Sequence, residues 1–325
     1  MGTINLSKWS MASASVAGVS HERNGAPCQD WVEITRNEKA FAVVLADGAG
    51  SKAFSDIGSR YAAQCVGKLL AEDFENLYSE DESTLKEKII EKSLEKIKGE
   101  AEEKQNDVGE FSATLLFVAI SQGRYIAGNL GDGVIGFEKN GAYGVMFHPI
   151  RGEFANQTFF ITHKNAAQII EIKRGELDGI TGFVLMTDGV SDLLYSRRER
   201  ELSAACLTIQ EWLRCNPQKK VCQALENNIK NLFREKTGDD CSLAVVGKLS
   251  LSNESLRQKP EEFQSDFLGC CTKASLNNRL SVIDALAELD NPDAPIEAIG
   301  KRTKLSGPWI KRHLVKVREL IDVGE

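Results

Sequence analysis

The segment from Ala40 to Gly50, AFAVVLADGAG, limits what this chain can fold into more than any other part of the sequence. Apolar side chains fill every position from Phe41 to Ala46, so they point to both sides of an extended backbone. This pattern predicts a strand that is buried on both faces. The apolar run ends at Asp47-Gly48, where a carboxylate and a closely approachable backbone carbonyl can hold a hard cation.

A plain turn is the alternative interpretation of Asp47-Gly48, because Asp-Gly is a common turn dipeptide. The recurrence of the pattern favours the cation site. FVLMTDGVSD, which begins at Phe183, is a second apolar strand that ends in Asp-Gly, and YIAGNLGDG ends in Asp132-Gly133. Strand ends with this chemistry therefore occur at several distant points of the chain.

Aspartates that follow or adjoin apolar strands are the candidate ligands: Asp47, Asp132, Asp188 and Asp239. If the sheets bring these strand ends together, the carboxylates repel one another unless cations supply a counter-charge. Oxygen-only ligands favour Mg²⁺ or Mn²⁺ over zinc. Two such ions about 3.5–4 Å apart would activate a water for in-line attack on phosphorus.

Hydrophobic periodicity predicts many strands and few helices in the first 250 residues. Strand patterns cover residues 10–19, 31–35, 41–46, 112–120, 125–130, 134–137, 143–147, 159–162, 182–186 and 242–246. Helical patterns cover residues 54–74, 83–105 and 218–233. The strands and helices do not alternate regularly, so a layered α+β sandwich is favoured over a doubly wound parallel sheet.

The composition changes after Leu249, where SLSNESLRQKPEEFQ is polar and has no apolar period. We therefore expect a large domain over residues 1–250, a linker over 251–262 and a small helical module over 263–325. In this module, residues 278–289 form a helical stripe, and Pro295 and Gly307-Pro308 each begin another helix. The last two helices are similar to a helix-turn-helix unit.

The predicted helical module carries seven Lys or Arg and no acid from Lys301 to Arg318. This basic stretch indicates either a solvated face of a protein-docking module or a surface that contacts nucleic acid. The chain as a whole has a net charge of −7, which argues against general nucleic-acid binding. A protein or DNA partner for the module therefore stays open.

Composition places the protein in a reducing, cytoplasmic compartment without a membrane segment. The eight cysteines form no CxxC pairs, so neither a zinc ribbon nor a disulfide framework is indicated. No apolar stretch approaches the ~20 residues that a bilayer-spanning helix needs. The N-terminus MGTINLSKWS also lacks the apolar core of a signal peptide.

Taken in order, the motifs resemble those of the type 2C metal-dependent serine/threonine phosphatases, and of their divergent bacterial branch in particular. The matching pieces between residues 10 and 248 are CQD (28–30), ADGAG (46–50), SATLL (112–116), GNLGDG (128–133), GEFANQTFFIT (152–162), MTDGVSD (186–192) and GDDCSLAVV (238–246). The resemblance implies two packed antiparallel sheets flanked by helices. It also implies metal-dependent hydrolysis of phosphoserine and phosphothreonine in substrates of a Ser/Thr kinase.

The resemblance also implies a ligand set for two ions. Asp47 resembles the carboxylate that bridges both ions, and the Gly48 carbonyl is a further ligand. Asp188 and Asp239 resemble the remaining direct ligands of one ion, and Asp30 acts on the other ion directly or through water. Asp132 resembles the family's ligand for a third, weaker ion, which it shares with Asp188.

The sequence departs from the family pattern at several positions. The usual glutamate before Asp30 is Gln29, and the arginine expected after the Gly-Asp motif is absent. Arg23 is the candidate for the phosphate-binding arginine, and His21 is the candidate proton donor to the leaving alkoxide. A surface histidine without a role is the alternative for His21. These departures leave open the reading of a phosphatase fold that binds phosphoproteins without hydrolysis. The C-terminal helices leave a second reading open, a DNA-linked regulator whose main activity lies in those helices.

Overall fold

The strand that ends at Asp47 belongs to an antiparallel sheet of five strands in the computed structural model, which describes residues 8–150 and 158–322. The order in this sheet is β2-β3-β4-β5-β8. Its strands are β2 (Asp30–Arg36), β3 (Ala40–Asp47), β4 (Leu115–Ser121), β5 (Arg124–Leu130) and β8 (Glu171–Glu176). We call this sheet the β3 sheet.

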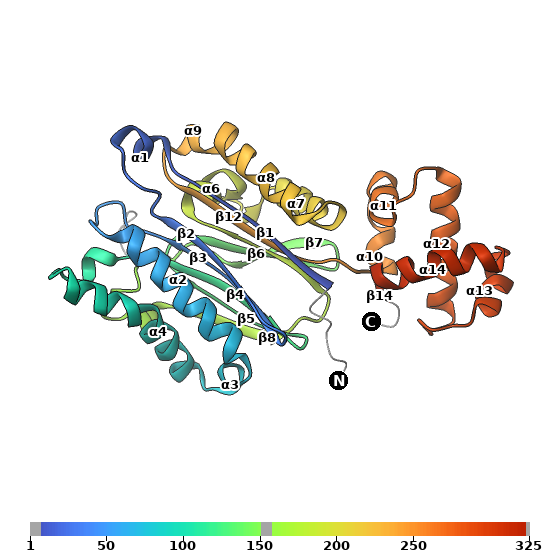
Figure 1. Cartoon of the computed structure of the whole chain (residues 1–325), viewed down its shortest axis with the longest axis horizontal. Helices are drawn as coiled ribbons and strands as arrows, with labels where there is room; N and C mark the ends of the chain where they lie inside the picture. The colour runs from blue at the N-terminus through green and yellow to red at the C-terminus, as the bar shows by residue number, and fades with distance from the viewer. Residues whose placement is uncertain (1–7, 151–157, 323–325) are drawn as a thin grey trace.

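A second antiparallel sheet of five strands packs against the first, in the order β1-β12-β9-β6-β7. Its strands are β1 (Trp9–Val16), β6 (Val134–Lys139), β7 (Ala142–Phe147), β9 (Ile180–Met186) and β12 (Cys241–Lys248). We call it the β12 sheet. Figure 1 shows the two sheets stacked in the centre of the large domain, with helices outside them.

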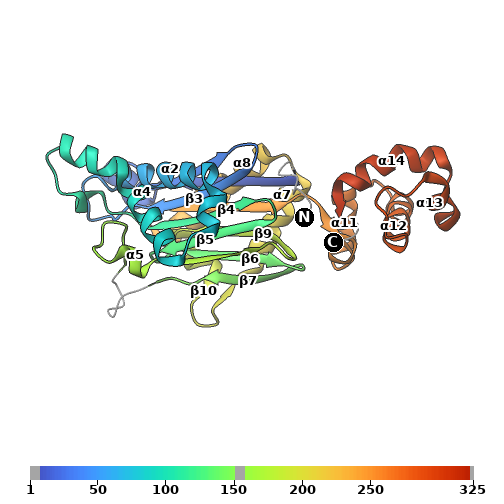
Figure 2. The ribbon, with the colours of Figure 1, turned by 90° about the horizontal axis from the view of Figure 1, so that it is seen from below.

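Helices cover the outer face of each sheet, as Figures 1 and 2 show from two directions. The β3 sheet is covered by α2 (Ser55–Glu72), α3 (Phe74–Ser79) and α4 (Glu82–Glu103), and the β12 sheet by α7 (Ala204–Cys215) and α8 (Gln218–Asn228). Shorter elements are α1 (Val19–Asn24), η2 (Val108–Phe111), α5 (Ala166–Ile169), α6 (Asp188–Leu194), β10 (Tyr195–Ser196), β11 (Glu201–Leu202), η3 (Ile229–Phe233) and α9 (Arg234–Thr237). The predicted α+β sandwich of two antiparallel sheets flanked by helices is confirmed.

The alternating side chains of β3 enter two different apolar layers. Phe41, Val43 and Leu45 pack between the sheets, whereas Ala42 and Val44 pack beneath the helices. All of them are fully buried, so the expectation of a strand buried on both faces is confirmed. Burying a large apolar side chain contributes roughly 1.5–3 kcal/mol. A shift of one residue in register would exchange the two sets of side chains, so packing fixes the position at which β3 ends.

Several elements differ from the sequence-based expectations. Residues 159–162 form a turn region instead of a strand, while β8 and α7 were not predicted. Helix α7 buries Gln210 on the side that faces the sheet, and the Gln210 amide donates to the Val246 carbonyl at 2.7 Å. The predicted helix over 218–233 is regular only to Asn228, and a π-helical turn follows it.

The C-terminal helices form a separate layer beside the sandwich, which Figure 1 shows in orange and red. We call residues 251–322 the C-terminal module. Its elements are β13 (Leu251–Ser252), α10 (Asn253–Arg257), α11 (Glu261–Leu268), α12 (Lys273–Glu288), α13 (Ile296–Thr303), α14 (Gly307–Leu320) and β14 (Ile321–Asp322). The predicted helical character is therefore confirmed. Three residues join α13 to α14, and the likeness of this pair to a helix-turn-helix unit stays a prediction.

The prediction of a linker over residues 251–262 is wrong for its local structure. Residues of this segment form β13, α10 and the start of α11. Leu251 and Leu256 are buried in the apolar core of the C-terminal module. The segment resembles a linker in sequence because its partners lie far along the chain: Leu251 pairs with Ile321 of β14, and α10, which carries Leu256, contacts α12.

A buried ionic cluster joins the C-terminal module to the sandwich. The carboxylate of Glu138 on β6 is fully buried and pairs with the Arg214 guanidinium of α7. Lys259 reaches the same carboxylate and that of Glu211, at 3.4 Å in each case. Burial alone would raise the pKa of Glu138, but Arg214 and Lys259 outweigh burial and hold that pKa below its usual value. Among the described residues, no helix has the length and apolar character needed to cross a membrane.

We expect a chain truncated after Ser250 to fold as a soluble domain. The core of the module is separate from the three apolar layers of the sandwich, and Glu138 keeps its Arg214 partner without Lys259. Calorimetric unfolding should show one cooperative transition. Breaking a buried ion pair typically lowers the free energy of unfolding by ~3–5 kcal/mol. In the full chain, Arg214→Met should lower it by this amount, and Lys259→Met should lower it by less. Aggregation of the truncated chain would show instead that the two parts fold as one unit.

Candidate metal centre

Three aspartates from separate strand ends meet at one end of the sandwich. Asp47 is the last residue of β3, Asp132 follows β5, and Asp188 is the first residue of α6 after β9. Each offers a carboxylate oxygen, and these oxygens all lie within 4.8 Å of one another. The structure therefore brings together three of the predicted ligands from positions that are far apart in sequence. We call these three residues the aspartate triplet.

Backbone contacts fix the position of Asp47 and Gly48. The Asp47 amide donates to Thr114 Oγ1 at 3.0 Å, and the Thr114 amide donates to the Asp47 carbonyl at 2.8 Å. A Cβ atom on Gly48 would lie 2.7 Å from the Ser55 carbonyl oxygen and 2.8 Å from that of Gln29. Only glycine fits this space, so the Asp-Gly pair is required by close packing as well as by its position after the strand.

Asp30 lies directly opposite Asp47 in the β2–β3 register and is buried. Thr187 Oγ1 donates to Asp30 Oδ2 at 2.9 Å, whereas Asp30 Oδ1 is buried without a hydrogen-bond donor among the described residues. Burial raises the pKa of Asp30 to about 8, and the nearby Asp240 adds to this effect. A buried carboxylate oxygen without a donor is suited to accept a cation, directly or through a bridging water.

Repulsion among the carboxylates of the triplet favours the binding of positive charge. Burial, followed by the carboxylates of Asp30 and Asp188, raises the pKa of Asp47 well above its usual value. Burial, followed by Asp132 and Asp239, raises the pKa of Asp188 to about 6. Buried carboxylates that repel one another become stable as anions when divalent cations neutralise them. The residues therefore fit hard cations with oxygen ligands, such as Mg²⁺ or Mn²⁺.

The loop that carries Asp132 is held by tight packing and by one hydrogen bond. Thr158 Oγ1 donates to Asp132 Oδ2 at 2.7 Å. Gly131 has a φ of +122°, which strains any other residue. A Cβ atom on Gly133 would lie 2.7 Å from the Met186 carbonyl oxygen, so the loop that leads into β6 approaches the end of β9 closely here. This approach places Asp132 beside Asp188. Residues 152–157 of the GEFANQTFFIT motif lie outside the described residues.

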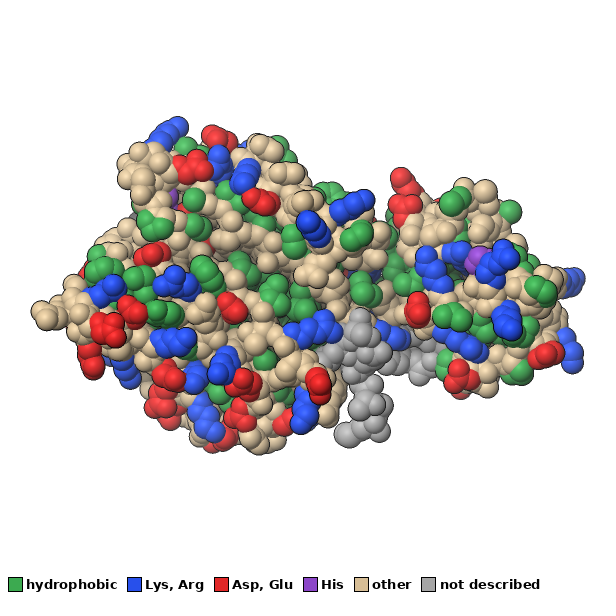
Figure 3. Space-filling view, in the orientation of Figure 1, with side chains coloured by type: hydrophobic (Ala, Val, Ile, Leu, Met, Phe, Trp, Pro, Cys, Tyr) green, Lys and Arg blue, Asp and Glu red, His purple; other side chains and the backbone are tan. Residues whose placement is uncertain are grey.

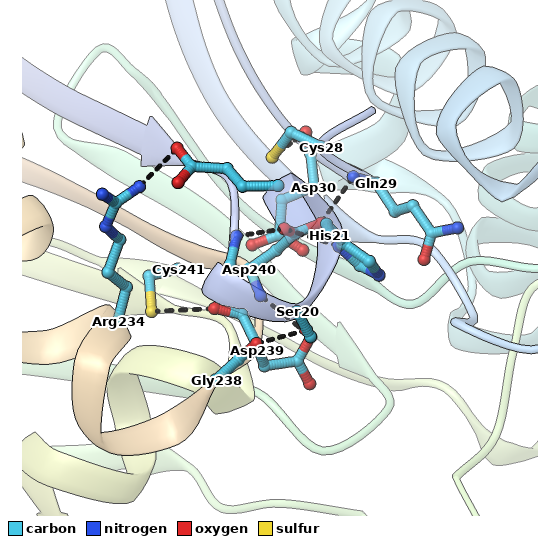
Figure 4. A network of polar contacts seen from close by, with 12 residues as sticks. Ser20, His21, Cys28, Gln29, Asp30, Arg234, Gly238, Asp239, Asp240 and Cys241 are labelled. Atoms are coloured by element: carbon cyan, nitrogen blue, oxygen red, sulfur yellow. Dashed lines mark hydrogen bonds and ion pairs between the residues drawn. The ribbon is translucent and has the colours of Figure 1, made fainter. Parts of the chain in front are cut away.

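Asp239 and Asp240 have different positions at the start of β12. Asp239 is exposed and outside the triplet, although it is near enough to raise the pKa of Asp47 and of Asp188. Asp240 is buried and accepts hydrogen bonds from the backbone amides of Gly18 at 2.7 Å and Gln29 at 2.6 Å. Figure 4 shows this network of polar contacts. Asp240 thus ties β1 and the Cys28–Asp30 segment to the start of β12.

His21 and Arg23 lie on α1, next to this network. His21 Nδ1 is 2.8 Å from Asp240 Oδ1, and the histidine side chain is 17% exposed. Arg23 is exposed on the same short helix. Neither residue belongs to the aspartate triplet. Sequence reasoning did not assign Asp240 or the threonines at 114, 158 and 187 to the site, because their roles depend on partners that are distant in sequence.

The chain was compared with protein families, curated proteins and solved structures. A model of the family "Protein phosphatase 2C" matches residues 17–236, more than half of the chain. The "Serine/threonine-protein phosphatase 3" of Escherichia coli (strain K12) is 26% identical over 254 residues, which are 73% of this chain and 98% of the relative.

Solved bacterial structures share the fold at low identity. The S. agalactiae serine/threonine phosphatase has a TM-score of 0.52 at 18% identity and covers 74% of this chain and 99% of its own. The serine/threonine phosphatase Stp1 from Staphylococcus aureus has a TM-score of 0.52 at 13% identity, with 76% and 96% covered. PppA of Pseudomonas aeruginosa has a TM-score of 0.51 at 17% identity, with 74% and 97% covered.

Without metal, the free energy of unfolding should fall as pH rises from about 4 to about 8, the interval over which Asp30 titrates in the unfolded and folded chains. Within it, the folded protein retains a proton that the unfolded chain has released, so stability decreases with pH. Denaturant titrations in EDTA across this range measure the slope, and the difference between wild type and Asp30→Asn isolates the contribution of Asp30. Mn²⁺ should remove the difference. An identical slope in both proteins would contradict the prediction.

Proposed function

The chain belongs to the protein phosphatase 2C family, and we propose from this premise that its aspartate centre holds the divalent cations with which it removes phosphate from phosphoserine and phosphothreonine in proteins. We infer two tightly bound ions, Mg²⁺ or Mn²⁺, and a third, weaker one. The observation that carries the proposal is the convergence of the carboxylates of Asp47, Asp132 and Asp188 within 4.8 Å.

Residues of the chain hold and orient the reacting groups in this proposal. Asp47 and the Gly48 carbonyl lie at the end of β3, where they would hold the ions. Asp188 and Asp239 would complete the ligands of one ion, and Asp30 would serve the other directly or through water. When bound, the divalent cations supply Lewis acidity and a water activated for attack on phosphorus. Because the carboxylates are fixed by sheet register, little reorganisation is needed as charge develops on the phosphoryl group.

The position of His21 supports its role as the proton donor to the leaving group. Because a carboxylate accepts, the imidazole donates from Nδ1 to Asp240, and this contact fixes the orientation of the ring. Loss of this donor matters for a serine alkoxide and matters little for p-nitrophenolate, which leaves without a proton. Equal losses on both leaving groups in His21→Gln would exclude the role. Arg23, exposed on the same helix, is proposed to contact the phosphate.

We also infer the setting in which the enzyme works. All eight cysteines are free in the structure, which supports a reducing compartment such as the cytoplasm. The substrates would then be phosphoproteins made there by serine/threonine kinases. The alternative of a phosphatase fold that only binds phosphoproteins gains no support, because the aspartate triplet is assembled.

Asp47→Asn and Asp188→Asn should each abolish Mn²⁺-dependent hydrolysis of p-nitrophenyl phosphate while the fold is retained. The amide lacks the second anionic oxygen, so the cation loses a ligand and the attacking water is not formed. Activity is measured with Mn²⁺ and with EDTA, and circular dichroism checks the fold. Ser20→Ala, next to the site but outside the ligand set, is the control and should keep activity. Activity near that of wild type in either aspartate variant would exclude the two-metal mechanism.

Asp132→Ala and Asp239→Ala should have different effects on metal binding. If Asp132 serves only the weaker ion, its variant keeps both tight ions and loses turnover, while Asp239→Ala loses one tight ion. Calorimetric titration with Mn²⁺ measures the number of tight sites in each variant. The reverse result would place Asp132 among the ligands of the tight ions.

A further inference from the structure

Arg279 on α12 is a buried cation that has no acidic partner among the described residues. Arg279 is 8% exposed, and its Nε and Nη1 atoms are buried without a hydrogen-bond acceptor among the described residues. Its Nη2 is 3.0 Å from His313 Nδ1 on α14. Because a guanidinium only donates, the imidazole accepts at Nδ1 and carries its proton on Nε2. Arg279 and His313 together therefore present several unused donors.

Lys316 brings a second positive charge to the same place. A Cβ atom placed on Gly269 would lie 2.6 Å from Lys316 Nζ and 3.7 Å from Arg279 Nη1. The two cationic groups thus converge over the backbone of Gly269, which is exposed at the end of α11. Figure 3 shows Lys and Arg side chains gathered around a histidine on this module. Gly269 and Lys316 are exposed, so the cluster borders solvent although Arg279 itself is buried.

Unlike the cations of this cluster, two other arginines of the module have acidic partners. Arg302 pairs with Glu288 at 3.3 Å, and Arg318 with Asp293 at 4.0 Å. Across residues 8–150 and 158–322, no ion pair includes Arg279 or Lys316. Burial, followed by Arg279 and Arg312, lowers the pKa of His313. An uncompensated buried charge is costly, so an anion that reached this place would be bound favourably.

We propose that Arg279, His313 and Lys316 form a binding site for the phosphate group of a phosphorylated protein segment, separate from the metal centre. A phosphate monoester carries about −1.5 to −2 charges at neutral pH and several acceptor oxygens, which match two cations and an imidazole N–H. The choice of a phosphoprotein as the carrier rests on the proposed function. A recessed arginine suits a compact phosphate better than a duplex lying across exposed lysines.

The site lies at the opposite end of the molecule from the aspartate triplet. Strand β12 runs from Cys241, beside Asp240, to Lys248, three residues before the C-terminal module begins. Its eight residues alone span about 25 Å at ~3.3 Å per residue. A phosphate bound by Arg279 is therefore not the one being hydrolysed. It would belong to another segment of the same substrate, which the module would dock while the metal centre acts elsewhere.

Binding is tested on the full chain in EDTA, which suppresses anion binding at the metal centre. The probes are inorganic phosphate and a short peptide with a central phosphothreonine, with the unphosphorylated peptide as reference. Calorimetry and thermal unfolding should show binding and a rise in Tm for wild type. Arg279→Met and Lys316→Ala should each weaken binding about tenfold or more, because a hydrogen bond to a charged group contributes roughly 1.5–3 kcal/mol. Lys316 is exposed, so its variant leaves folding intact.

Lys311→Ala is the matched control, since Lys311 is an exposed lysine of the same helix outside the cluster. It should leave phosphate and phosphopeptide binding unchanged. Equal binding by wild type, Arg279→Met and Lys316→Ala would overturn the proposal. So would binding of phosphate without the phosphopeptide, which would assign the site to the free anion. Binding of duplex DNA that depends on Lys311 as well, without phosphopeptide binding, would overturn it in favour of nucleic acid.

Activity separates this inference from the proposed function. With Mn²⁺, Arg279→Met and Lys316→Ala should hydrolyse p-nitrophenyl phosphate like wild type. On a multiply phosphorylated protein such as casein, they should show a higher KM with kcat unchanged. If wild type fails to hydrolyse p-nitrophenyl phosphate, the proposed function fails while the binding result stands independently. If wild type hydrolyses it and the variants show no change in KM on the protein, the docking role is excluded.

Discussion

Mutual repulsion among buried carboxylates is the constraint on which this structure depends. Asp30, Asp47, Asp132 and Asp188 approach one another where water is scarce, and burial together with their neighbours raises the pKa of Asp30, Asp47 and Asp188. Such a cluster is stable only with protons or cations among its oxygens. The strands, glycines and threonines around it hold the carboxylates in place against this repulsion. Because the carboxylates repel one another without metal, the arrangement favours the binding of divalent cations.

The positions of these carboxylates depend on how the strands of the sandwich pair. Asp30 faces Asp47 because β2 and β3 pair residue by residue, and Asp240 joins the start of β12 to β1 and to Gln29. The apolar layers above and below β3 prevent any shift of this register. Disturbing the packing far from the aspartates would therefore move their oxygens. The position of the metal centre thus depends on the full set of strands.

Two other buried charged residues, Glu138 and Arg279, differ in whether a group of opposite charge lies beside them. Glu138 is surrounded by Arg214 and Lys259, so its charge is compensated within the protein and joins the module to the sandwich. Arg279 has no such partner among the described residues, and another cation, Lys316, lies beside it. A compensated charge is typical of a structural joint, whereas an uncompensated one near solvent is typical of a binding site. The C-terminal module supplies Lys259 to the first of these sites and Arg279 to the second.

The sequence alone determined the central strand, the α+β sandwich and the Asp-Gly ends that form the triplet, because these follow from local alternation and from motif order. It did not determine which of Asp239 and Asp240 faces inward, since both stand at the same strand start and only contacts with Gly18 and Gln29 distinguish them. Nor could it show that Leu251 and Leu256 are buried or that Arg279 meets Lys316. These contacts join residues from separate helices and strands, so they exist only once the chain has folded.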